Sequence, residues 1–272
     1  MINTVIKTTA LALGTPLTIT AAYLLYLNHN VSPHITATTK LRRTPSDKSL
    51  SGIPKPKCIP PDVADENSPY ILAYERVTSH PLSLSKFHPN ADTASPSSLL
   101  TRYIRATMTA FSYTPQVYLL KRMMSKDDFA TLNTFNRERI ASLEFDVGDR
   151  VHGVWRVAYR GDLHSQEGKG EGHRVELAME APPGYNGPVV QGVVVVGVER
   201  VDGEHVVFVN ETWMWRRKGE KKVMLEGAAG RWFHVLLSGW LVKRGVEEVM
   251  GGGEARGEEK GKGKGEEKEK GV

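Results

Sequence analysis

The stretch ETWMWRRKGEKKVMLEGAAGRWFHVLLSGWLV, residues 211–242, holds four of the five tryptophans of this 272-residue chain. Its beginning reads as a strand, and nearly every residue from Trp232 to Val242 is large and apolar. A helix with so few polar positions must be enclosed on most sides. We therefore expect Trp213 and Trp215 to stand on a strand of a sheet that curls around this final helix.

The segments before this stretch predict an antiparallel meander. Residues 149–162 and 173–182 alternate apolar and polar side chains, as half-buried strands do, whereas residues 189–201 are apolar on both faces. The pair Asp202-Gly203 accepts the positive φ of a tight hairpin turn, so it should connect two neighbouring strands.

The order of the remaining elements completes the folded region. Residues 70–79 have the β-branched and aromatic content of a strand, and residues 97–113 place apolar side chains at helical spacings. A second helix is expected after Pro115 and a third from Ser125 to about Arg139. The sequence thus predicts an α+β domain from Pro69 to Met250.

This order of elements is similar to the helix-grip order of the START-like superfamily, which includes lipid-transfer domains, plant pollen-allergen-like ligand carriers and polyketide cyclases. The resemblance covers residues 69–250 and rests on element order, since no diagnostic motif is present. It implies a curved antiparallel sheet wrapped round a long C-terminal helix, with an elongated apolar cavity between them. It supplies no catalytic residues.

A hot-dog thioesterase, in which one long helix lies in a sheet, is the alternative architecture. It would account for a central helix followed by strands. The tryptophan-rich final helix would have no counterpart in it, so we favour the helix-grip interpretation.

The N-terminal 31 residues predict a transmembrane anchor. No Lys, Arg, Asp or Glu occurs from Thr8 to Thr39, and about 18 mostly apolar residues are enough to cross a bilayer as a helix. Tyr23 and Tyr26 stand where interfacial rings are common. More basic residues follow the span than precede it, so the folded domain should face the cytoplasm.

Two other interpretations of this N-terminus remain open. A cleaved secretory signal would have a shorter apolar core followed by small residues at a cleavage site. A mitochondrial presequence would be rich in arginine, whereas Lys7 is the only basic side chain before Lys40. Either would give the mature domain a different location from the one that a cytoplasm-facing anchor predicts.

Two segments are expected to be disordered. Residues 32–68 are rich in Pro, Ser, Thr and Lys and have few large apolar side chains to offset the entropy of ordering, so they read as a tether. Residues 251–272 combine glycines with six acidic and six basic side chains and read as a solubilising tail.

Composition argues against several classes of function. The formal charge is +5, but the basic residues form no stripe interleaved with aromatics, so we expect no nucleic-acid partner. The single cysteine, Cys58, excludes an intramolecular disulfide and a multi-cysteine zinc site. No spacing of His, Asp or Glu suggests a metal site, and we predict no cofactor.

Three side chains are weak candidates for acid-base chemistry. Glu211 would be a desolvated carboxylate if it shared the inward face with Trp213 and Trp215. His234 lies on the apolar final helix, and Tyr159 on a predicted strand. Each is also explained by an ordinary structural role, so the sequence leaves open whether the chain is an enzyme.

Three functions follow from this reading. The first is a membrane-anchored domain that binds a lipid, sterol or polyketide, with an apolar pocket lined by Trp155, Trp213, Trp215, Trp232, Leu236 and Trp240. The second is an enzyme of the same fold, such as a cyclase, hydrolase or isomerase, or a hot-dog-type thioesterase, acting on an apolar substrate. The third is a membrane-tethered interaction protein with a solid core.

Overall fold

The computed structural model describes residues 22–87, 95–163, 172–185, 187 and 190–251. Residues 22–31 are helical. The further elements are η1 (Ser32–His34), β1 (Ile35–Arg42), α2 (Pro61–Ala64), β2 (Tyr70–Ser79), β3 (Leu82–Ser83), η2 (Leu84–Lys86), α3 (Pro96–Phe111), α4 (Pro115–Arg122), α5 (Phe129–Asn133), α6 (Arg137–Ser142), β4 (Arg150–Val151), β5 (Trp155–Asp162), β6 (Gly172–Met179), β7 (Gln191–Arg200), β8 (His205–Arg217), η3 (Met224–Glu226) and α7 (Ala228–Val249).

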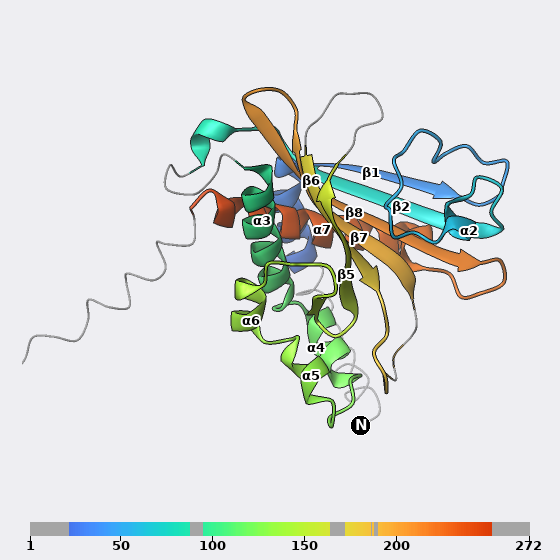
Figure 1. Cartoon of the computed structure of the whole chain (residues 1–272). Helices are drawn as coiled ribbons and strands as arrows, with labels where there is room; N and C mark the ends of the chain where they lie inside the picture. Colours follow the sequence, from blue (N-terminus) through green and yellow to red (C-terminus); the bar gives the residue numbers. More distant parts are fainter. Residues whose placement is uncertain (1–21, 88–94, 164–171, 186, 188–189, 252–272) are drawn as a thin grey trace, which may run out of the picture.

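Within the described residues, one antiparallel sheet of eight strands dominates the molecule (Figure 1). The strand order is β1-β2-β8-β7-β6-β5-β4, and β3 pairs with β8. The predicted meander of β5, β6, β7 and β8 is confirmed, with the β7–β8 hairpin closed by a backbone hydrogen bond from Val201 to His205. The fold class is α+β, with a large antiparallel sheet and a long C-terminal helix.

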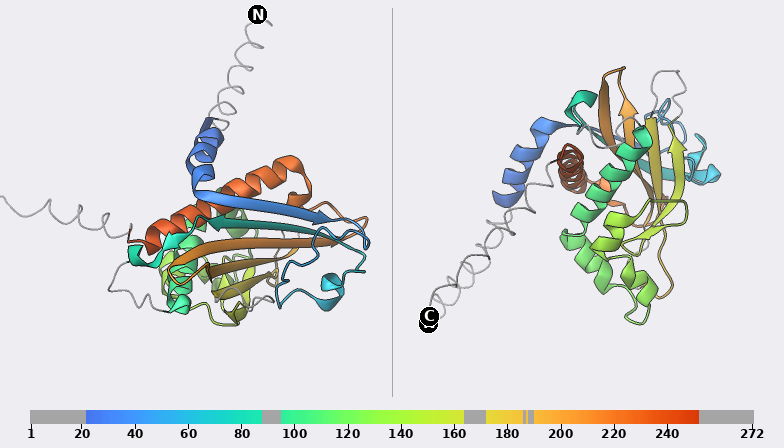
Figure 2. Two further views of the ribbon diagram at one scale, coloured as in Figure 1. Left: turned by 90° about the horizontal axis from the view of Figure 1, so that it is seen from above. Right: turned by 60° about the vertical axis from the view of Figure 1, so that its left-hand side comes forward.

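Two long helices cover one face of the sheet, as the two views in Figure 2 show. Helix α3 packs against α7, β6 and β7, while α7 packs against β1, β2 and β8. The main core lies between them and includes Tyr103 of α3, Val242 of α7 and Phe208 of β8. This sheet-plus-helix arrangement is compatible with a helix-grip fold.

The segment predicted to be a disordered tether is instead ordered. Residues 35–42 form β1, which pairs with β2 along its whole length. Residues 43–69, which we call the strap, lie on the face of the sheet opposite α7 and bury Leu50, Ile59 and Val63 there. The prediction failed because three threonines and a few scattered apolar residues carry little local signal, and the stability comes from long-range pairing.

The tryptophans do not meet around α7 as expected. Trp213 and Trp215 point to the opposite face, where the strap covers them together with Tyr74. The inward face of β8 carries Phe208, Asn210 and Thr212 instead. Alternation along a strand shows that two faces differ, but not which face a helix will cover.

The predicted membrane anchor lies largely outside the described residues, which begin at residue 22. Among the residues that are described, no helix is both long and apolar enough to cross a bilayer. Of the C-terminal tail, only Gly251 is described.

Candidate functional site

The three side chains proposed for acid-base chemistry lie apart. Glu211 and Tyr159 point to the strap side of the sheet, whereas His234 lies on α7 on the other side. Tyr159 accepts a hydrogen bond from Lys57 Nζ at 2.9 Å and donates to the Asp162 carbonyl at 3.2 Å. The structure therefore does not bring these three groups into one site.

Glu211 is held by structural contacts. It forms an ion pair with Arg76, which also pairs with Glu199 at 2.6 Å. Tyr74 Oη and Trp213 Nε1 each donate to a carboxylate oxygen of Glu211 at 3.3 Å. With both oxygens engaged, Glu211 is the centre of a partly buried ionic network on the strap side of the sheet.

The six residues predicted to line a ligand pocket are distributed over three places. Trp213 and Trp215 lie under the strap, and Trp155 packs at the edge of the main core. Leu236 is buried on α7, but Trp232 is 44% exposed. None of the six lines either of the two pockets described below, and their role as ligand contacts stays a prediction.

The partner of His234 is a residue that the sequence analysis missed. Glu75 of β2 accepts a hydrogen bond from His234 Nδ1 at 2.7 Å, and Ser238 Oγ lies 3.3 Å from the same nitrogen. Glu75 is only 1% exposed. Its inward position between Ala73 and Val77 could have been noticed, because alternation places these three on one face.

This pair can orient and polarise an imidazole. A carboxylate on Nδ1 fixes the tautomer in which Nε2 is available as a proton acceptor. Ser238 contacts Nδ1 rather than Nε2, so it does not stand where an activated nucleophile would. Among the described residues, His234 makes hydrogen bonds only through Nδ1.

Glu75 also has unused hydrogen-bonding capacity. Its Oε2 is buried and has no partner among the described residues. A buried carboxylate oxygen without a partner is unfavourable by about 1–3 kcal/mol. A donor group, such as a water or a ligand hydroxyl, would be stabilised at this position.

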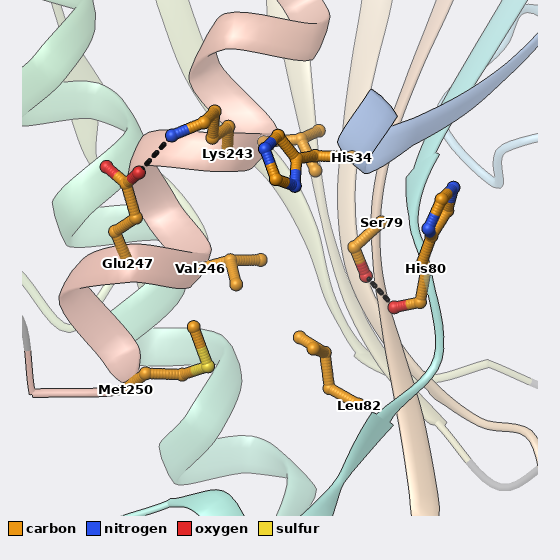
Figure 3. Close-up of a pocket in the computed structure, with 9 residues that line it drawn as sticks. His34, Ser79, His80, Leu82, Lys243, Val246, Glu247 and Met250 are labelled. Atoms are coloured by element: carbon orange, nitrogen blue, oxygen red, sulfur yellow. Dashed lines mark hydrogen bonds and ion pairs between the residues drawn. The ribbon is translucent and has the colours of Figure 1, made fainter. Parts of the chain in front are cut away.

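A cleft of about 210 Å³ opens between α7 and the ends of β2 and β3. We call it the α7 cleft; its lining residues are His34, Ser79, His80, Leu82, Val242, Lys243, Val246, Glu247 and Met250. Figure 3 shows Leu82 and Met250 near one end, His34 near the other and Val246 between them. Lys243 and Glu247 pair with each other on the helix.

The α7 cleft and the Glu75–His234 pair belong to the same sheet–helix interface. On α7, His234, Ser238, Val242 and Val246 recur every four residues and so follow one side of the helix. On β2, Glu75, Val77 and Ser79 alternate onto the same face. The interface is therefore polar toward the beginning of α7 and apolar toward its end.

A second cavity, of about 230 Å³, lies beside the strap. Its lining is largely polar and includes Arg42, Asp47, Lys55 and Glu66. Arg42 is committed to structure there, because it donates to the carbonyls of Val63 and Asp65. Eight of its ten lining residues are polar or charged, so it suits a hydrophobic molecule less well than the α7 cleft does.

The described residues do not favour chemistry by a reactive thiol or by a bound metal ion. Burial raises the pKa of the Cys58 thiol, and the neighbouring Glu176 carboxylate raises this pKa further, so Cys58 is unsuited to act as a thiolate nucleophile. Within the described residues, no group of three or more His, Cys, Asp or Glu side chains could hold a metal ion.

No protein-family model, curated protein or solved structure matches this chain. The similarity to the helix-grip arrangement is therefore one of architecture. A function has to be argued from the site itself.

Proposed function

We propose that this chain is a membrane-anchored, START-like domain that binds a small hydrophobic molecule between its sheet and its C-terminal helix. The observation that carries this proposal is the α7 cleft, an apolar hollow at the place where a helix-grip cavity would open. The anchor is the apolar N-terminal segment, and the folded domain faces the cytoplasm.

The dimensions of the cleft limit its occupant. A volume of about 210 Å³ corresponds to roughly seven water molecules at ~30 Å³ each. Such a space accommodates a short hydrocarbon chain or part of a larger molecule, such as one end of a lipid or polyketide. A ligand would bury its own apolar surface against Leu82, Val242 and Val246, while His34 and Lys243 at the rim would favour a polar or anionic end group.

Native mass spectrometry of the full chain, released from detergent after exposure to a cell lipid extract, tests the proposal. The wild type should retain an apolar mass. Val246→Phe places a ring in the α7 cleft and should abolish retention, whereas Val201→Phe, at a residue 55% exposed on the β7–β8 turn, should not.

Trp232→Ala separates this cleft from the tryptophan-lined pocket expected from the sequence. Because Trp232 is not part of the lining, the α7 cleft predicts unchanged retention in this variant. If Trp232→Ala lost the ligand and Val246→Phe retained it, the result would contradict binding in the α7 cleft. Absence of any bound mass in the wild type would favour an interaction protein with a solid core.

The Glu75–His234 pair favours one second candidate, a hydrolase or isomerase in which His234 Nε2 removes a proton from an apolar substrate. Hydrolysis of a series of p-nitrophenyl esters would detect the hydrolytic form of this activity. Turnover should fall about a hundredfold or more in His234→Gln and less in Glu75→Gln, because Glu75 acts only through the imidazole. Equal turnover in wild type and His234→Gln would exclude this candidate.

A further inference from the structure

Four large apolar side chains are exposed on α4, on α5 and on the turn that precedes α4. Tyr113 is 67% exposed, Tyr118 66%, Leu119 54% and Phe129 79%. All four lie within 17 consecutive residues of the sequence. We call this surface the α4–α5 tip. Clusters of this kind on a folded domain mark interaction surfaces, because isolated exposed residues would be scattered.

Helix α4 has one side that packs on the domain and another that exposes both apolar and basic side chains. Val117 points into a small core with Met124 and Phe135, which anchors the helix to the domain. Tyr118 and Leu119 point outward, and the basic residues Lys121 and Arg122 are exposed beside them. Aromatic rings next to basic side chains are typical of segments that lie in a membrane interface.

Electrostatic attraction alone would not hold this surface on a bilayer. The segment from residue 113 to 138 has four basic and three acidic side chains. One of the acids, Asp128, caps α5 through the Thr131 amide at 2.9 Å. One of the bases, Arg137, stacks over Tyr113 at 4.8 Å from the ring centroid. The aromatic and aliphatic side chains must therefore provide most of the affinity.

The course of the N-terminal helix bears on what the tip contacts. Helix 22–31 is fixed at the domain end, where Val31 and Ile35 lie close to Gly239 of α7. In Figure 1 and in the right view of Figure 2 it descends toward the end at which α4 and α5 lie, and the left view of Figure 2 shows that it leaves the domain on the α7 side. Tyr23, Leu25 and Tyr26 on this helix are also exposed, by 58%, 65% and 64%.

We propose that the α4–α5 tip rests in the headgroup region of the bilayer that holds the N-terminal segment. This inference depends on the proposed anchor, which holds the domain close to the membrane. Once the anchor has limited the distance, insertion of a few rings needs little intrinsic affinity, because the effective concentration of membrane is high. The contact would fix the orientation of the domain and leave the β7–β8 hairpin directed away from the bilayer.

Site-directed spin labelling of the full chain in phosphatidylcholine vesicles tests the contact. Cys58→Ser removes the single cysteine, and Phe129→Cys then places one label at the tip. Val201→Cys, at an exposed position on the β7–β8 turn, is the matched control, and Tyr23→Cys reports on the anchor. The readout is the collision rate of each label with oxygen, which enriches in lipid, relative to a water-soluble nickel complex.

The expected result is an oxygen-to-nickel ratio several-fold higher at positions 23 and 129 than at position 201. It should change little when salt is raised, since apolar insertion carries the contact. A high ratio at 23 with an aqueous value at 129 would overturn the tip contact and leave the anchor intact. Aqueous values at both positions would overturn the anchor, and the tip contact with it.

Discussion

His152 is an imidazole that the fold keeps neutral. It is fully buried between Phe111 and Phe135, and Ser112 Oγ lies 2.9 Å from its Nε2. Burial lowers the pKa of His152 to about 3. Its Nδ1 has no partner among the described residues.

Acid should therefore destabilise the protein through this residue. Between pH 6.5 and about 3 the unfolded chain binds a proton at His152 that the folded chain does not, so the free energy of unfolding falls as the pH falls through this window. The loss should reach about 2 kcal/mol by pH 5.

Urea unfolding of wild type and His152→Asn at pH 7 and pH 5 measures this contribution. Asn tolerates the φ of 50° at this position and does not titrate. The variant should be less stable at pH 7, because it is smaller, but its loss between pH 7 and pH 5 should be smaller than that of the wild type. Equal losses in the two proteins would show that His152 does not cause the acid sensitivity.

At the scale of elements, α3 and α7 are in contact because α7 lacks a side chain where they cross. A Cβ at Gly245 would lie 2.5 Å from the ring of Tyr103 and 2.7 Å from Thr107 Oγ1. Tyr103 is fully buried and its hydroxyl donates to Asn210 at 3.1 Å, so the ring cannot move aside freely. Glycine at this position allows both helices to lie on the same face of the sheet.

Gly245→Ala should lower the free energy of unfolding by about 1–3 kcal/mol, although alanine is the better helix former. Thermal or urea unfolding would detect the change. Gly203→Ala is the matched control, because nothing lies within 4 Å of the added methyl group. A stability gain in Gly245→Ala would mean that α3 and α7 can separate at little cost.

At the scale of the whole molecule, the sheet is covered on both faces, by two helices on one side and by the strap on the other. The strap is held by hydrogen bonds of charged side chains to its backbone. Glu176, which is fully buried, accepts from the Lys57 and Cys58 amides at 2.9 Å each, and Arg174 lies 2.7 Å from its Oε1. Arg42 binds the strap carbonyls at the other end.

Glu176→Gln should loosen the strap, because an amide cannot accept both backbone hydrogen bonds and no longer neutralises Arg174. Loss of one such bond is unfavourable by about 1–3 kcal/mol, enough to raise local opening by about fivefold to a hundredfold. Trypsin should then cleave after Lys57 faster than in the wild type. Glu144→Gln, which removes an acid paired with Arg105 of α3 on the face of the sheet opposite the strap, should leave the cleavage rate unchanged.

Much of the architecture was readable from the sequence. The strands of the meander, the place of the β7–β8 hairpin and the long C-terminal helix were predicted because periodicity and turn-forming residues are local properties of the chain. The positive φ expected at Asp202-Gly203 does not occur, because the hairpin closes through a longer loop between Val201 and His205. The candidate site was harder to predict from the sequence. His234 was recognised as a polar residue on an apolar helix, but its partner Glu75 lies 159 positions away, so only the folded chain brings them together.

The sequence by itself determined which segments become strands and helices in the meander and the final helix, since each follows from the spacing of apolar residues within a few turns or pleats. The tertiary structure decided which face of β8 meets α7, that residues 35–42 add a strand to the sheet, and that the strap buries Trp213 and Trp215. These outcomes depend on pairing and packing between segments far apart in the chain. No local pattern reports the free energy of such contacts.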